Sequence, residues 1–222
     1  MRPHTEQIRP PRALWVPFAL GRPLGVPADP AFQTAVLIAA LELLERESGP
    51  VIADYEIDAP EPADDEQPVI LACPIPRRSA ANGTHPPSTR SLLAAEIAFL
   101  RPWYEQGRRT RGRTTVGVSG LTPEAAADLL ADWTHGGDGA GVTAAALKLA
   151  IDDLRAYCLE AGAAQPGAGS DHRRLERWYW WETAIGSALR AAHNQAVNSA
   201  DPAVRMLGKV LMIPVAQKAT TA

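Results

Sequence analysis

Apolar residues recur at helical spacing along most of the chain. In the segment that begins with Asp29 and Pro30, for example, Phe32, Val36 and Leu43 fall on one side of a helix, and the capping aspartate followed by proline is typical of a helix start. Comparable stripes begin after residues 88, 122, 141, 170 and 201. The pattern therefore predicts about six helices.

Strand-like patterns are shorter and fewer. Residues 13–18, "VILACPIP" at 69–76 and "TTVGVS" at 114–119 are rich in β-branched and apolar residues and are bounded by turn residues. The predicted fold is mainly α with a small β-sheet (α+β), with about six helices and three or four short strands in a single domain over residues 1–222. Residues 51–68 form an expected acidic, proline-rich loop, and residues 163–170 a possible linker to the C-terminal helices.

The segment "RRLERWYWWETAIGSALRAAHNQ", residues 173–195, places four aromatic rings in consecutive positions. A helix built from it carries rings on more than half of its circumference, with Trp178 on the core stripe and Trp180 and Trp181 to either side. Two interpretations stay open: a deeply buried core helix, or a helix whose Trp180 or Trp181 lies in an interface or a ligand pocket. We expect more ring surface here than the fold can cover. Glu182, beside the rings, is a candidate for an ion pair or a ligand contact.

Composition narrows the class of protein. The chain is 46% hydrophobic with a net charge of −3 and a pI near 6.0, which gives no electrostatic footprint for nucleic acid. Apolar runs are too short to cross a bilayer, and the N-terminus shows no secretory signal, so we expect a cytoplasmic protein.

Few residues are candidates for a catalytic, metal-binding or ligand-binding role. Cys73 follows an apolar strand and precedes a proline, where a nucleophile can emerge, although a buried thiol is the commoner outcome; Cys158 lies on a helix stripe and is expected in the core. The histidines show no metal-ligand spacing, so neither a metal nor a cofactor is predicted. Arginines such as Arg101 are candidate carboxylate clamps. The run 108–113, rich in arginine, either binds an anion or caps a solvated helix end.

The segment "LWVPFALGRPLGVPADPAFQTAVLIAALELL", residues 14–44, resembles the C-terminal part of component B of the glycine/sarcosine/betaine reductase family, the selenoprotein B group. In that family a segment with the pattern G-x-P-x-G-x-P leads into a helix of this kind. Two further segments, "TRSLLAAEIAFLRPWYEQ" and "RWYWWETAIGSALRA", are similar to small proteins that accompany reductase-B-like chains in bacteria.

This resemblance implies a component of a heteromeric, thiol-dependent reductive system that acts on small amino acid derivatives. The chain lacks the selenocysteine and the paired redox cysteine of that family. It is therefore expected to be an accessory subunit that contributes assembly surface and pocket walls, with Arg22 and Gly25 near a shared site. Its partner would be a reductase-B-like catalytic chain or another copy of itself.

Two alternatives come from other classes. The chain could be a stand-alone enzyme with Cys73 as nucleophile and arginines that clamp a carboxylate. It could also be a module that binds a small carboxylate and is closed by the loop 51–68. Whether it catalyses a reaction alone is left open at this point.

Overall fold

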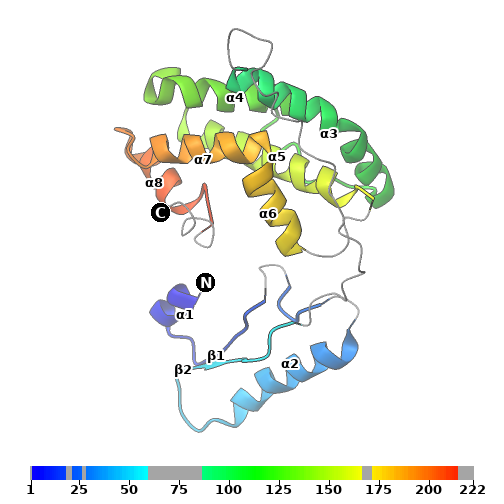
Figure 1. Ribbon diagram of the computed structural model, residues 1–222. Coiled ribbons are helices and arrows are strands. Elements are labelled where there is room, and N and C mark those ends of the chain that lie inside the picture. The colour runs from blue at the N-terminus through cyan, green and yellow to red at the C-terminus, as the bar shows by residue number, and fades with distance from the viewer. Residues whose placement is uncertain (1, 19–21, 27–28, 60–86, 167–171, 215–222) are drawn as a thin grey trace. The chain divides into compact units, whose positions relative to one another are not determined.

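The computed structural model describes residues 2–18, 22–26, 29–59, 87–166 and 172–214 (Figure 1). The chain divides into two compact units, residues 1–65 and 66–222, where the sequence indicated one domain. We call them the N-terminal unit and the C-terminal unit. Their boundary lies inside the expected acidic loop.

The N-terminal unit is built on one β-α-β crossover. A short helix α1 (Arg2–Ile8) precedes strand β1 (Arg12–Trp15), helix α2 (Pro30–Glu42), the 3-10 turn η1 (Leu43–Glu45) and strand β2 (Val51–Asp54). The two strands are parallel, paired from Arg12↔Val51 to Trp15↔Asp54. A parallel pair needs a crossover connection, and α2 provides it. Residues 51–54 of the expected loop are thus a strand, and residues 60–68 of it lie outside the described residues.

Helix α2 begins as its sequence predicts. The side chain of Asp29 accepts the N–H of Phe32 at 3.0 Å, and Pro30 occupies the first turn. On the inner side of the helix Val36 and Leu43 are buried, and the ring of Phe32 packs against Phe18 with centroids 5.5 Å apart. Aromatic and aliphatic packing therefore holds α2 on its own unit.

The regular elements in the described part of the C-terminal unit are all helices or helical turns. It contains α3 (Thr89–Arg111), α4 (Pro123–Gly136), the 3-10 turn η2 (Gly137–Ala140), α5 (Ala144–Ala163), α6 (His172–Glu182), α7 (Ala184–Ala196) and α8 (Pro202–Val210). Helix α5 contacts α3, α4, α6, α7 and α8 and forms the centre of the bundle (Figure 1). Its stripe of Leu147, Ile151, Leu154 and Cys158 is buried, as the spacing predicted.

The predicted mainly α fold with a small sheet is confirmed, but the element counts are not. The described residues contain eight α-helices and two strands. One extra helix is α1, and the other arises because the aromatic segment breaks at Thr183, whose hydroxyl accepts the N–H of Gly186 and starts α7. A single predicted helix is thereby divided in two.

One local expectation in the C-terminal unit is wrong. Residues 114–119 form turns and not a strand, because their N–H groups bond to carboxylates of α5. Helix α3 continues through Pro102 to Arg111. Proline has no backbone N–H, so the carbonyl of Ala98, four residues earlier, lacks its helical hydrogen bond. Both residues are exposed, so water can donate to that carbonyl instead. The remaining expected strand, residues 69–76, lies outside the described residues.

Candidate functional site

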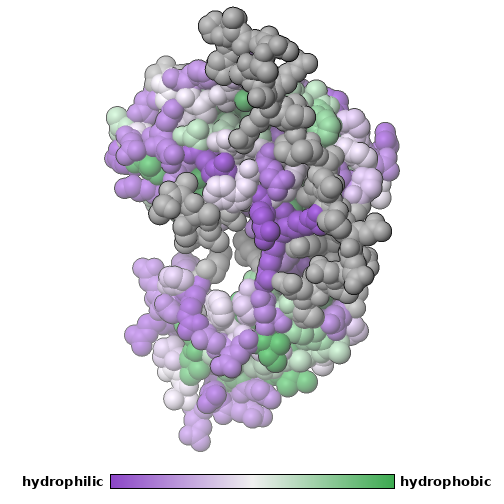
Figure 2. All heavy atoms as spheres, viewed as in Figure 1, coloured by the Kyte–Doolittle hydropathy of each residue, from purple (hydrophilic) through white to green (hydrophobic). Residues whose placement is uncertain are grey.

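The outer side of α2 and of the turn η1 that follows it is an exposed aliphatic surface. Leu37, Ile38, Leu41 and Leu44 are 47%, 51%, 61% and 66% exposed, and their spacing places them in one stripe opposite Val36 and Leu43. Figure 2 shows hydrophobic surface over the helix that Figure 1 labels α2. We call these four side chains the α2 outer face. A helix that is apolar on both sides is typical of an element that lies between two layers.

A tight turn is fixed at the start of α2. The N–H of Gly25 donates to the carbonyl of Arg22 at 3.0 Å, and Gly25 has φ +84°, which favours glycine. A Cβ at Gly25 would lie 2.5 Å from the Cε1 atom of Phe32, and the side chain of Gln33 donates to the carbonyl of Val26 at 2.8 Å. The candidates Arg22 and Gly25 therefore belong to the same unit as the α2 outer face.

The aromatic helix does not present its rings as the sequence suggested. Trp178, Tyr179 and Trp180 on α6 are 2%, 0% and 0% exposed. Close packing makes this possible, since Gly162 of α5 has no side chain where a Cβ would lie 2.8 Å from the ring of Trp178. The expectation that the rings exceed what the fold can cover is wrong for Tyr179 and Trp180, whereas Trp178 is buried as its place on the core stripe predicted. Trp180 is a core residue of the C-terminal unit.

Trp181 is the partly exposed member of the series. It packs against the core, and the guanidinium of Arg190 lies 4.3 Å from its ring centroid. Glu182, the last residue of α6, is exposed. The two candidates thus lie at the rim of the C-terminal unit, separated from the α2 outer face by about 140 positions of sequence.

The buried rings of α6 carry donors without partners among the described residues. These donors are the indole N–H groups of Trp178 and Trp180 and the hydroxyl of Tyr179. Burial raises the pKa of Tyr179, so its phenol stays protonated at neutral pH. A neutral, enclosed phenol of this kind is a packing element.

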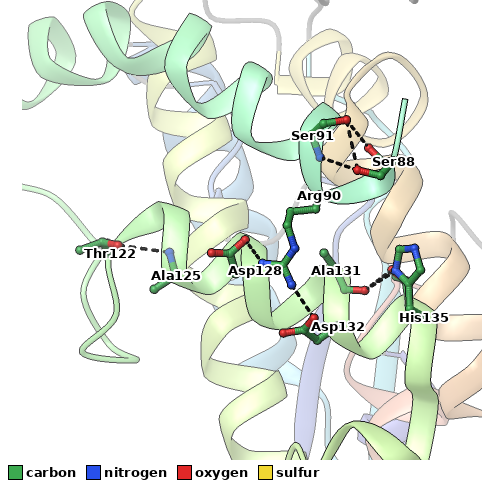
Figure 3. A network of polar contacts seen from close by, with 10 residues as sticks. Ser88, Arg90, Ser91, Thr122, Ala125, Asp128, Ala131, Asp132 and His135 are labelled. Atoms are coloured by element: carbon green, nitrogen blue, oxygen red, sulfur yellow. Dashed lines mark hydrogen bonds and ion pairs between the residues drawn. The ribbon is translucent and has the colours of Figure 1, made fainter. Parts of the chain in front are cut away.

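Basic side chains of α3 bind acidic side chains of α4. Figure 3 shows Arg90 reaching from the start of α3 to Asp128 and Asp132. The candidate Arg101 makes an ion pair with Glu124 in the same manner. Both arginines are about half exposed and tie two helices together, which is a structural use of their charge.

The run of arginines at the end of α3 is also engaged. Arg108 donates to Glu105 at 3.1 Å, Arg109 to Gln106 at 3.0 Å and Arg111 to Glu160 at 2.9 Å. Cations in the last turn of a helix also complement the helix dipole. This arrangement favours the interpretation as a capped helix end.

A buried carboxyl group clamps the start of α7. Glu96 of α3 is 3% exposed and accepts the N–H groups of Ala184 and Ile185 at 2.7 Å each. Burial raises its pKa, and the two backbone hydrogen bonds lower it in part. The carboxyl satisfies N–H groups that a helix start leaves without intrahelical partners.

Two acidic residues of α5 hold the turns at residues 114–119. Asp153 accepts the N–H groups of Gly117, Val118 and Ser119 at 2.7–3.0 Å. Glu160 accepts the N–H of Thr115 at 2.8 Å as well as the guanidinium of Arg111. Although burial alone raises the pKa of each carboxyl, these hydrogen bonds prevail and lower both. The sequence contained one signal of these contacts, namely acidic residues at buried positions of α5. The prediction of a strand at 114–119 hid their role as partners of the turn N–H groups.

The two cysteines give different outcomes. Cys73 lies outside the described residues. Cys158 is fully buried, and burial raises the pKa of its thiol well above the ordinary value, so it is the inert core thiol that its position predicted. Among the described residues no group of three or more acidic, histidine or cysteine side chains could hold a metal ion.

Among the residues that the structure describes, no helix is both long and apolar enough to span a bilayer. Comparisons with protein-family models, curated proteins and solved structures found no match to this chain. The α2 outer face and the adjoining turn at Arg22–Gly25 are consequently the candidate site that geometry favours.

Proposed function

We propose that this chain is an accessory subunit that assembles through the α2 outer face. The observation that carries the proposal is the exposure of Leu37, Ile38, Leu41 and Leu44 on a helix whose other side is already packed. An exposed aliphatic stripe of this kind gains free energy when another surface removes it from water.

The distribution of polar chemistry supports the same role. The buried carboxyls Glu96, Asp153 and Glu160 each accept hydrogen bonds from backbone N–H groups that shape the C-terminal unit. Their lone pairs are used for folding. The C-terminal unit would then act as a stable body, and the N-terminal unit would make the contacts.

The assembly that we propose is a heteromeric, reductase-B-like complex acting on small amino acid derivatives. The resemblance of residues 14–44 to component B of that family supports it, and the α2 outer face lies within this segment. In this complex another chain supplies the redox thiols, and the turn at Arg22 and Gly25 contributes to the wall of a shared pocket. The buried Trp180 is not part of the proposed contact surface. Trp181 can contribute to it only through the exposed part of its ring.

Affinity capture from the native host tests the proposal. The tagged wild-type chain is expected to bring down a chain with a redox cysteine or selenocysteine, and the captured complex is expected to reduce a small amino acid derivative in the presence of a dithiol. Leu41→Glu, which places a charge on the α2 outer face, should reduce the recovered partner at least about 10-fold.

The matched control is Met206→Glu, which introduces the same charge at a residue of α8 that is 60% exposed. It should leave the recovery unchanged. Equal capture by Leu41→Glu and the wild type, or turnover by the chain alone, would contradict the accessory role.

One observation keeps a second function in view. Arg22 lies in a turn that packs closely against Phe32 of α2, which would give a carboxylate clamp a defined place. Titration of the pure chain with glycine or acetate, followed by calorimetry, would detect such a carboxylate-binding module without any partner present.

A further inference from the structure

We draw no further inference here: the strongest candidate, the exposed aliphatic stripe of Leu37, Ile38, Leu41 and Leu44 on the outer side of α2 and η1, belongs to the site already described, and nothing in the structure shows what covers it.

Discussion

Helices α2 and α6 both carry clusters of large apolar side chains, and the structure treats them differently. On α6, Trp178 and Trp180 are enclosed by α5 and α7. On α2, Leu41 and Leu44 stay exposed although the opposite side of the helix is packed. A cluster of large apolar side chains on a helix therefore does not by itself show whether the helix's own unit covers it.

The difference follows from what surrounds each helix. The C-terminal unit offers several long helices and a glycine, Gly162, that lets Trp178 approach α5 closely. The N-terminal unit offers a two-stranded sheet, which has room for one side of α2 only. The four predictions below test this contrast, and the largest expected effect comes first.

Replacing a buried ring of α6 should unfold the C-terminal unit most readily. Trp180→Ala leaves a large cavity in the core and should lower the free energy of unfolding by about 4 kcal/mol. The neighbouring Trp181→Ala removes a partly buried ring and its contact with Arg190, for which we expect a loss of about 2 kcal/mol or less. Urea unfolding followed by far-UV circular dichroism measures both. Similar losses for the two variants would contradict the contrast between enclosed and rim rings.

The C-terminal unit should also depend on its internal carboxylates in a pH-dependent way. Asp153→Asn weakens three backbone hydrogen bonds and should cost about 2 kcal/mol at pH 7. Because the pKa of Asp153 is lowered in the folded protein, its contribution is complete above the ordinary value of 3.8 and is lost as the pH falls through the folded pKa. The difference between variant and wild type should therefore shrink in acid.

The adjacent Asp152→Asn is the control for this measurement. Asp152 is partly exposed, and among the described residues it pairs with Lys148 across one helical turn, so its replacement should have a small effect at every pH. Thermal unfolding at a series of pH values would separate the two positions. A pH-independent loss for Asp153→Asn would contradict the assigned role of the carboxylate.

A change in the turn before α2 should act on the N-terminal unit alone. Gly25→Ala forces a side chain into a φ of +84° and against the ring of Phe32, which should cost about 1–2 kcal/mol. Hydrogen exchange should increase in α2 and stay unchanged in α5. Pro23→Ala, at an exposed position of the same turn, is the control. Faster hydrogen exchange in both units would show that the two units do not unfold independently.

The smallest effect is expected for the surface ion pairs between α3 and α4. Arg90→Gln removes contacts with Asp128 and Asp132 that face water (Figure 3). The melting temperature should fall slightly at low salt, and the difference from the wild type should disappear at high salt because ions screen exposed charges. A large decrease that salt does not reduce would place this network among the main stabilising contacts.

Much of the helical architecture was predictable from local sequence. The caps Asp29, Ser88, Thr122 and Asp201 each accept a backbone N–H at the start of the helix that the stripes predicted. Capping chemistry acts within a few residues, so sequence shows it directly. The break at Thr183 followed the same chemistry but was hidden among aromatic residues whose stripe continues on both sides.

The candidate site was less predictable because it depends on tertiary contacts. Both the enclosed Trp180 and the exposed Leu41 are large apolar residues within a helix, and this local description does not tell them apart. Arg101 was expected to bind a ligand but faces Glu124 from a helix that is distant in sequence. The turns at 114–119 were predicted as a strand because β propensity cannot show that Asp153 will take their N–H groups. Long-range partners decided each of these outcomes.

The carboxyl of Glu96 has a consequence for how the protein is made. Its two partners at the start of α7 lie 88 and 89 residues further along the chain. A ribosome adding about 10 residues per second needs roughly nine seconds to deliver them. Until then the carboxyl of Glu96 lacks the two N–H partners that offset its burial. Nascent chains cut short before α7 are therefore expected to be recognised by proteases, and closure of the bundle has to wait until synthesis is nearly finished.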